Sequence, residues 1–192
     1  MIRIIGMLEI IIFYIAYFMK LFEQSKRGIR TNQLGKGSKP KRTVLIEKIL
    51  NLSSITTVLI ILASAIMDTS LIPIESIRWS GLLFIGVGTI LFIIAMITMK
   101  DSWRAGIPEK DSTAMVTSGI YQYSRNPAFL GFDLTYIGTS LAFGNLILFS
   151  MAVITMIMMH LQILEEEKFL DITFGEDYLE YKKKVGRYFI FI

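Results

Sequence analysis

Two polar segments of the chain carry the side chains whose types and spacing could do chemistry. The first, SGIYQYSRNPAFLGF at residues 118–132, places Arg125 and Asn126 at the mouth of an apolar stretch. The second opens with three glutamates at 165–167, directly after another apolar stretch. A guanidinium offers a rigid fork that matches a carboxylate. Neighbouring residues of a helix project about 100° apart, so at least one glutamate can turn inward. The first segment predicts an anion site, and the second predicts a carboxylate that faces Arg125 or a cationic ligand.

The junction between Asn126 and Pro127 predicts the start of a helix. Proline is accommodated in the first helical turn, and asparagine is a favoured N-cap whose side chain accepts from free backbone N–H groups. A helix N-terminus also attracts carboxylates, and Arg125 adds a fixed positive charge beside it. Together these features predict an anion pocket at the surface of a bilayer.

The elements that must position these residues are long apolar blocks. Hydrophobic residues make up 53% of the 192 positions, and the mean hydropathy is +0.56. Three blocks of about 20 residues, the length that crosses a ~30 Å hydrocarbon core, occupy 4–22, 49–67 and 80–99. These blocks predict three membrane spans.

The fourth apolar block, residues 129–164, is too long for one span because its 36 residues would form a helix of about 54 Å. Near its middle lie the turn-favouring residues Gly138, Gly144 and Asn145. We therefore expect a helical hairpin over 128–164, with arms at 128–143 and 146–164. The alternative is one tilted helix with a soluble extension.

These blocks predict an all-α integral membrane bundle of about five transmembrane helices, forming a single membrane domain over 1–192. Three spans lie in 1–99, and 100–192 holds the hairpin and a tail at 165–192. In that tail, Gly175 is expected to break a helix that resumes afterwards.

The basic residues predict the orientation. The loop at 23–48 carries eight lysines and arginines, and such loops stay in the cytoplasm. Five crossings then place the N-terminus outside and the C-terminus in the cytoplasm, in the cell membrane if the chain is bacterial. The loop at 100–126 and the tail share the cytoplasmic face, so both polar segments can form one composite site. A basic loop also permits nucleic-acid binding, but anionic lipid headgroups are the simpler partner beside a membrane.

Several chemistries have no support in the sequence. The absence of cysteine excludes disulfides, thiolate zinc sites and cysteine nucleophiles. His160 is the sole histidine, so no metal site is expected and His160 is interpreted as structural or interfacial. Asp133 lies inside a predicted span, where an ionisable residue is either functional or paired with a neighbour; the sequence leaves both open.

At this point the residues resemble a family. The segment VTSGIYQYSRNPAFLG, an apolar hairpin and EEEKFLDITFGEDYLEYKKKVGR are similar to isoprenylcysteine carboxyl methyltransferases of prokaryotic type, whose C-terminal signature is shared with phospholipid N-methyltransferases. The resemblance covers residues 115–187. The matching positions are Gly119, Tyr121, Arg125, Pro127, Gly131, Glu166, Glu167, Leu170, Phe174, Gly175, Tyr178, Tyr181 and Val185.

The resemblance implies methyl transfer from S-adenosylmethionine to a lipophilic acceptor that arrives from the bilayer. It implies that Arg125 holds a carboxylate of cofactor or acceptor, and that Glu166 or Glu167 holds the cofactor's amine or ribose. Arg125 and Glu167 are the expected catalytic residues. The expected cofactor-binding residues are Gly119, Tyr121, Arg125, Asn126, Pro127, Glu166 and Glu167. Many family members have histidine where this chain has Asn126, which keeps a hydrogen bond but cannot titrate near neutral pH.

The acceptor remains open at this stage. The family favours O-methylation of a prenylcysteine-type carboxylate, and the alternative is a phospholipid or another lipid amine or hydroxyl. A hypothesis of another class is a non-catalytic membrane scaffold or transporter component, in which Arg125 and the glutamates only anchor the helices at the interface.

Overall fold

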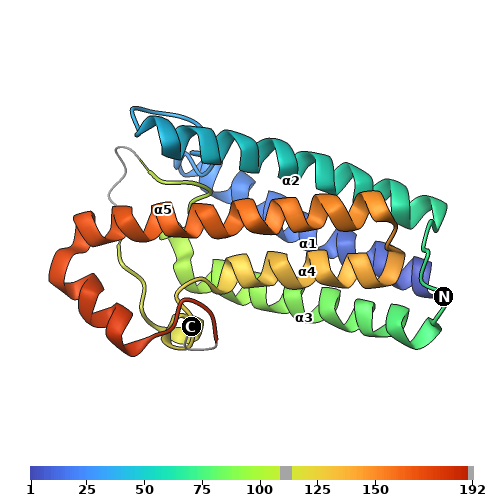
Figure 1. Ribbon diagram of the computed structural model, residues 1–192. Helices are drawn as coiled ribbons and strands as arrows, with labels where there is room; N and C mark the ends of the chain where they lie inside the picture. The colour runs from blue at the N-terminus through green and yellow to red at the C-terminus, as the bar shows by residue number, and fades with distance from the viewer. Residues whose placement is uncertain (109–113, 190–192) are drawn as a thin grey trace.

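The computed structural model describes residues 1–108 and 114–189, and within them it confirms the all-α prediction. The described residues form five α-helices, which lie side by side (Figure 1). Their bounds are α1 Ile2–Lys26, α2 Lys41–Met67, α3 Glu75–Met99, α4 Pro127–Phe143 and α5 Leu146–Lys184, with short 3₁₀ turns at Lys100–Ser102 and Gly119–Gln122.

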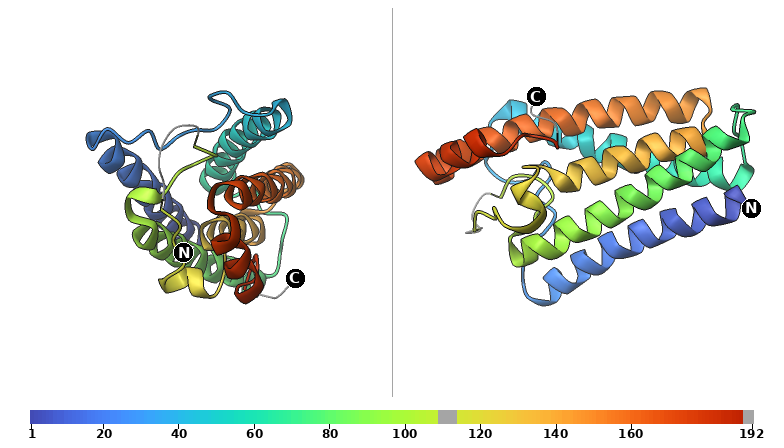
Figure 2. Two further views of the ribbon diagram at one scale, coloured as in Figure 1. Left: turned by 90° about the vertical axis from the view of Figure 1, so that its left-hand side faces the viewer. Right: turned by 90° about the horizontal axis from the view of Figure 1, so that it is seen from below.

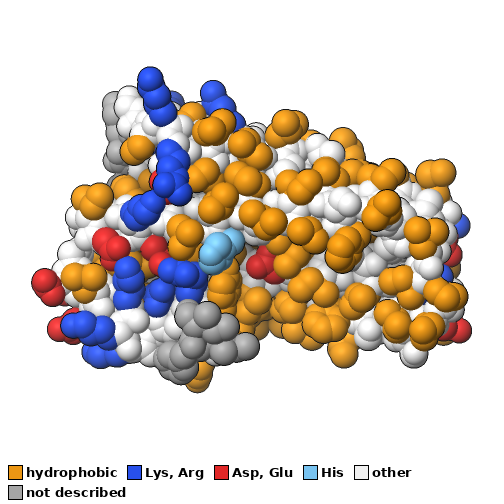
Figure 3. Space-filling model, in the orientation of Figure 1, with side chains coloured by type: hydrophobic (Ala, Val, Ile, Leu, Met, Phe, Trp, Pro, Cys, Tyr) orange, Lys and Arg blue, Asp and Glu red, His pale blue; other side chains and the backbone are white. Residues whose placement is uncertain are grey.

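Four of these helices, α1, α2, α3 and α5, are long and apolar enough to cross a membrane. The fourth predicted span, α4, has 17 residues, or about 26 Å at 1.5 Å per residue. Many large apolar side chains on the outer faces are exposed, and Figure 3 shows them as a broad belt across the visible face of the bundle. Such a belt is the surface expected against lipid, so the chain is a multi-pass integral membrane protein.

Successive helices run in opposite directions, so the connections between them alternate between the two ends of the bundle (Figures 1 and 2). The N-terminus, the link at 68–74 and the hairpin turn at 144–145 lie at one end. The loop at 27–40, the loop segments at 100–108 and 114–126, and the tail at 165–189 lie at the other. The two polar segments of the signature therefore meet at the same end of the bundle, as their positions around the hairpin predict.

Helices α3 and α4 approach each other through two pairs of glycines. A Cβ added at Gly81 would lie 2.6 Å from the carbonyl oxygen of Gly138, and one at Gly88 would lie 2.6 Å from that of Gly131. Only glycine leaves room for backbones at this separation, a common way of packing membrane helices. We call these pairs the glycine seam. Gly138 lies inside α4, within the predicted first arm at 128–143, and packs against α3.

The hairpin itself is confirmed, and its turn is built by Asn145. The side chain of Asn145 accepts from the Leu148 N–H at 3.0 Å and donates to the hydroxyls of Ser64 and Thr69 at 2.9 and 2.8 Å. One side chain thus starts α5 and ties the turn to the end of α2. This N-cap explains why the long apolar block divides after Gly144.

Beyond its apolar stretch at 146–164, α5 continues as a polar helix to Lys184. It bends at Gly175, whose φ of +54° is a conformation that favours glycine. The predicted break is therefore confirmed as a kink. The helix resumes with Tyr178 buried against the bundle, only 2% exposed.

Candidate active site

One carboxylate, Glu167, lies between two arginines at the loop-bearing end of the bundle. Arg125 donates to Glu167 Oε1 through Nη2 at 2.8 Å and through Nε at 3.3 Å. Arg187 donates through Nε to Oε1 at 3.1 Å and through Nη2 to Oε2 at 2.8 Å. The side chains of Arg125 and Glu167 are 9% and 7% exposed, and that of Arg187 is 27% exposed. The prediction that a post-hairpin glutamate faces Arg125 is confirmed for Glu167.

This arginine–glutamate–arginine group carries a net positive charge. Burial alone would favour the neutral acid, but hydrogen bonds and charges from Arg187 and Arg125 outweigh it and hold the pKa of Glu167 below its ordinary value of 4.5. The carboxylate is therefore ionised at neutral pH, and it neutralises only one of the two guanidinium groups. The remaining charge suits a carboxylate ligand.

The chain after α5 folds back over the start of α4, and we call residues 185–189 the C-terminal strap. Arg125 donates through Nη1 to the carbonyl oxygen of Val185 at 2.5 Å, and its backbone N–H donates to Gly186 at 3.0 Å. The hydroxyl of Ser124 donates to the Arg187 carbonyl at 3.2 Å. The strap thereby places Arg187 against Glu167, and Arg125 serves as its main attachment.

Asn126 lies at the N-cap position of α4, and Pro127 occupies the first helical position, as predicted. The expected side-chain cap is wrong, because the Asn126 side chain accepts no N–H from α4. Its Nδ2 instead donates to the carbonyl oxygen of Arg187 at 3.2 Å. The Asn126 amide therefore binds the Arg187 carbonyl of the strap, 61 residues away in the sequence, in place of the N-terminus of its own helix.

Tyr121 and Gly119 lie in the 3₁₀ turn before α4. Gly119 has a φ of +60°, and a Cβ there would lie 3.0 Å from Thr98, so both conformation and space favour glycine. Tyr121 is buried, and its carbonyl oxygen accepts from the Tyr181 hydroxyl at 2.5 Å. Burial raises the pKa of Tyr121 strongly, with smaller contributions from Tyr181 and the Glu166 carboxylate. A surface pocket of about 480 Å³ lies beside this turn, with Tyr181 and Val185 in its lining.

Glu166 has a different hydrogen-bond partner from Glu167. Its Oε1 accepts from Gln162 at 3.0 Å. Burial raises the pKa of Glu166 to about 7, against the opposing effect of the Gln162 hydrogen bond. Gln162 is fully buried, and its own Oε1 has no hydrogen-bond partner among the described residues. Glu166 and Gln162 therefore present acceptor atoms that a ligand's N–H or O–H groups could use.

A buried carboxylate on α2, Glu47, holds the neighbouring loops to this end of the bundle. It accepts from Lys39 at 2.7 and 2.9 Å, from the N–H groups of Gly35 and Ile107 at 2.8 and 3.0 Å, and from Gln162 at 3.4 Å. Its side chain is fully buried. The network joins two loops to α2 and α5, which fixes the walls around Glu166.

Sequence reasoning missed Arg187 and Glu47. Arg187 is the last residue of the matched segment but is not one of its matching positions. Glu47 lies at the end of a basic loop that was interpreted by its charge alone. A signal was available for Glu47, since an acidic residue at the start of an apolar span is costly without a partner. Glu165, the third glutamate, faces away and binds Thr43 and Lys168, each at 2.7 Å.

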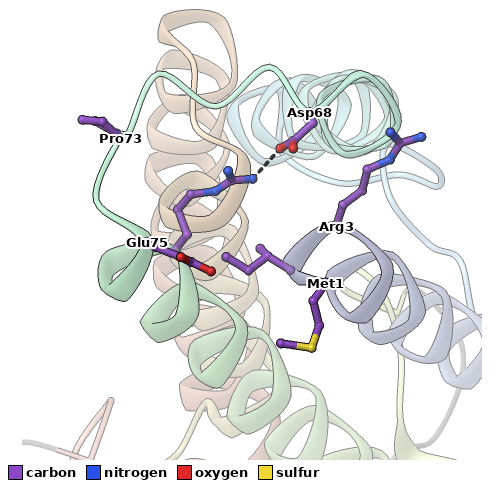
Figure 4. Close-up of a pocket in the computed structure, with 7 residues that line it drawn as sticks. Met1, Arg3, Asp68, Pro73 and Glu75 are labelled. Carbon is purple, nitrogen blue, oxygen red and sulfur yellow. Dashed lines mark hydrogen bonds and ion pairs between the residues drawn. The ribbon is translucent and has the colours of Figure 1, made fainter.

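The opposite end of the bundle has a pocket of about 320 Å³ (Figure 4). Met1, Arg3, Pro73 and Glu75 contribute to its lining, and Asp68 forms an ion pair with Arg78 at its edge. None of the signature residues lines it. The candidate site is therefore the charged end.

Comparisons with known proteins identify the family of this chain. Residues 76–177, more than half of the chain, match the model of the phospholipid methyltransferase family. The chain belongs to this family. The protein-S-isoprenylcysteine O-methyltransferase B of Arabidopsis thaliana is 31% identical over 146 residues, which cover 74% of each chain. The predicted resemblance is confirmed.

Other relatives of this family member share the same name and are longer. The protein-S-isoprenylcysteine O-methyltransferase of Xenopus laevis is 34% identical over 126 residues, or 62% of this chain and 44% of the relative. The human protein is 33% identical over 118 residues, or 58% of this chain and 42% of the relative. The chain thus spans less than half the length of these two relatives. Membership of the family implies a methyl donor.

Proposed function

We propose that this family member is an integral membrane methyltransferase that uses S-adenosylmethionine to esterify a lipophilic carboxylate of prenylcysteine type. The observation that carries the proposal is the arginine–glutamate–arginine group, assembled from both halves of the signature at the end of an apolar bundle. A net positive site at a bilayer surface suits an acceptor with an anionic head and an apolar tail.

The residues present fit S-adenosylmethionine by the chemistry of their donors and acceptors. Its amine and ribose hydroxyls need acceptors, which Glu166 and the unpartnered Oε1 of Gln162 offer. Its carboxylate needs a cationic donor, which Arg125 or Arg187 supplies. Tyr121 and Gly119 form the adjacent wall. These residues, together with Asn126 and Pro127 at the start of α4, are the proposed cofactor-binding set.

The chain's own residues do the positioning. When bound, the cofactor would supply a sulfonium-activated methyl group for direct displacement by the acceptor oxygen, with the neutral thioether as the leaving group. The arginine that does not hold the cofactor carboxylate orients the acceptor carboxylate, and Glu167 keeps both guanidinium groups in place. A carboxylate acceptor is already deprotonated at neutral pH, so orientation and charge are sufficient and no general base is needed. Asn126 in place of histidine is compatible with this chemistry.

The experiment that tests the proposal is labelled-methyl transfer by the purified protein into prenylcysteine compounds and membrane lipid extracts. We expect label in prenylcysteine methyl esters. Label in phospholipid instead would support the alternative that the family's description suggests. Titration calorimetry with S-adenosylhomocysteine distinguishes the methyltransferase proposal from the non-catalytic hypothesis. A folded sample that binds no S-adenosylhomocysteine would overturn the methyltransferase proposal.

We also propose that the charged end faces the cytoplasm and the N-terminus lies outside. The basic loop supports this orientation. The native chain has no cysteine, so single cysteines introduced as Lys36→Cys and Leu71→Cys can be labelled one at a time. An impermeant thiol reagent added to intact cells should label Leu71→Cys and spare Lys36→Cys. Labelling of Lys36→Cys but not of Leu71→Cys would show that the topology is the inverse of the one proposed.

A further inference from the structure

The pocket at the end of the bundle opposite the charged group is formed by three segments of the chain. It lies between the start of α1, the link at 68–74 and the start of α3, and its volume is about 320 Å³. This volume is at the lower end of the range for small-molecule sites, so it suits a head group rather than a whole lipid. We call it the N-terminal pocket; its charged lining residues are Arg3, Asp68, Glu75 and Arg78.

The four charged side chains of the N-terminal pocket comprise two cations and two anions, so their charges sum to zero. Arg78 forms an ion pair with Asp68, and its Nε donates to the carbonyl oxygen of Ala142 at 2.8 Å. Both interactions are satisfied within the protein, and the Arg78 side chain is only 19% exposed. One cation, Arg3, and one anion, Glu75, therefore remain for a ligand.

Arg3 and Glu75 are exposed and have spare hydrogen-bonding capacity. The Arg3 guanidinium has no ion-pair partner within residues 1–108 and 114–189. Glu75 Oε1 accepts from Trp79 Nε1 at 3.3 Å, which is long for a hydrogen bond. Figure 4 shows Arg3 projecting from α1 and Glu75 from α3, on either side of Asp68. A ligand with separated positive and negative groups can contact both.

Two helices begin at this pocket without a side-chain cap. The N-cap residues of α1 and α3 are Met1 and Ile74, and neither makes a side-chain hydrogen bond to its helix. The backbone N–H groups of a first helical turn have no acceptor within the helix, so they attract an anion. A phosphate in the pocket can therefore accept from backbone N–H groups as well as from Arg3.

The surroundings of the pocket are those of a bilayer interface. Ile4, Leu71 and Ile74 are large apolar residues next to the charged lining, and all three are exposed. Trp79 is half-buried one turn after Glu75, and tryptophan is enriched at the level of lipid head groups. A lipid with its head group in the pocket can place its acyl chains against these apolar side chains.

We propose that the N-terminal pocket binds a zwitterionic phospholipid with a primary ammonium, of phosphatidylethanolamine type, in the leaflet opposite the charged end. Arg3 receives the phosphate, and Glu75 accepts hydrogen bonds from the ammonium group. A choline head group has no N–H to donate, and a glycerol head group has no cation for Glu75. The bound lipid joins the start of α1 to the start of α3. The inference is independent of the proposed function, because no signature residue lines this pocket.

The test uses Trp79 as a reporter beside Glu75. The chain has two tryptophans, so Trp103→Phe leaves Trp79 as the only one. The purified full chain in detergent is titrated with phosphatidylethanolamine or phosphatidylcholine whose identical acyl chains carry bromine, which quenches a nearby tryptophan. We expect half-quenching at about a fivefold lower concentration of phosphatidylethanolamine, the effect of one exposed charge pair.

Three further variants, made in the Trp103→Phe protein, locate this preference. Glu75→Gln keeps an acceptor for the Trp79 N–H but removes the charge, so the ratio between the lipids should fall to about one. Arg3→Gln should weaken both lipids about fivefold and keep their ratio, because both have a phosphate. Glu23→Gln changes an exposed glutamate at the other end of α1 and should leave both affinities unchanged.

Two further measurements complete the test. Soluble glycerophosphoethanolamine has the same head group without acyl chains, so it should reverse the quenching only at more than about tenfold higher concentration than the lipid. Native mass spectrometry of the unaltered chain with equal amounts of the two lipids should show preferential retention of phosphatidylethanolamine, and it decides the question if Trp103→Phe does not fold.

Equal binding of the two lipids by the parent protein would show an adventitious lipid belt only and would overturn the site. A fivefold preference that persists in Glu75→Gln, or that disappears in Glu23→Gln, would also contradict the assignment. Displacement by glycerophosphoethanolamine at the concentration of the lipid itself would exclude a lipid as the ligand. None of these outcomes affects the proposed methyl transfer at the charged end.

Discussion

The glycine seam and the arginine–glutamate–arginine group hold the same bundle together by opposite means. The seam joins α3 and α4 by the absence of side chains, with each glycine backbone against the other helix. The charged group joins α4, α5 and the strap by long side chains with defined hydrogen bonds. In lipid, close packing is the main force available between helices, whereas at the polar end charge and hydrogen bonds can act. The glycine seam therefore supports the fold, whereas the arginine–glutamate–arginine group is available for ligands.

The largest effect is expected from filling the seam. Gly88→Ala places a methyl 2.6 Å from the Gly131 carbonyl and 2.8 Å from the Thr135 hydroxyl, so the two helices must separate. We expect a loss of about 3 kcal/mol in stability. Thermal unfolding in detergent measures it.

Gly86→Ala is the matched control on the same helix. A Cβ at Gly86 meets only the flexible end of Glu9 at 3.3 Å, so the change should stay within about 1 kcal/mol. Equal unfolding temperatures for the two variants would show that the seam does not limit the fold.

The next effect is expected from neutralising the carboxylate of the charged group. Glu167→Gln replaces the carboxylate that holds Arg125 and Arg187 in place, so S-adenosylhomocysteine affinity should fall about 30-fold as the two guanidinium groups lose their positions. The fold should survive, because the seam is untouched. The control is Glu165→Gln, which changes the adjacent residue, whose partners are Thr43 and Lys168. A similar loss in both variants would contradict a specific role for Glu167.

The pH dependence of stability distinguishes the two regions directly. The pKa of Glu167 is lowered from 4.5 in the folded protein, so its contribution is fully present above about pH 4.5 and is lost as the pH falls through the folded-state pKa. The difference in melting temperature between wild type and Glu167→Gln should therefore narrow below pH 4.5. The difference between wild type and Gly88→Ala should stay constant over the same range. A constant Glu167→Gln difference would contradict the lowered pKa.

The smallest effect is expected at Asn126. Asn126→Ala removes one hydrogen bond to the strap carbonyl of Arg187, which is worth about 1 kcal/mol. We expect about a fivefold loss of S-adenosylhomocysteine affinity, because the strap is still held by Arg125. Asn126→His can restore a donor and should recover part of it. A loss as large as that of Glu167→Gln would show that Asn126 contacts the ligand itself.

The sequence predicted much of the fold because the relevant signals are local. The lengths of the apolar blocks predicted the helices, and Gly-Asn predicted the hairpin turn that Asn145 builds. Gly175 was interpreted correctly as a break. The packing role of Gly138 could not be predicted, because a glycine that turns a chain and a glycine that admits a neighbouring helix look the same in one sequence.

The candidate site was predicted in part. The pairing of Arg125 with a post-hairpin glutamate followed from the position of both segments around the hairpin. Which glutamate turns inward depended on the rotation of α5 against α4, and the structure selects Glu167. Arg187 and the side-chain partner of Asn126 could not be foreseen, because both depend on the path of the strap.

The sequence by itself determined that this chain is a helical membrane protein with two polar signature segments at one end. Hydrophobic length and turn residues act over a few positions, so they can be recognised without the fold. Only the tertiary structure decided that two arginines share Glu167 and that glycines bring α3 and α4 together. Those features depend on contacts between residues distant in the chain, where the available space and the nearest partner are set by packing.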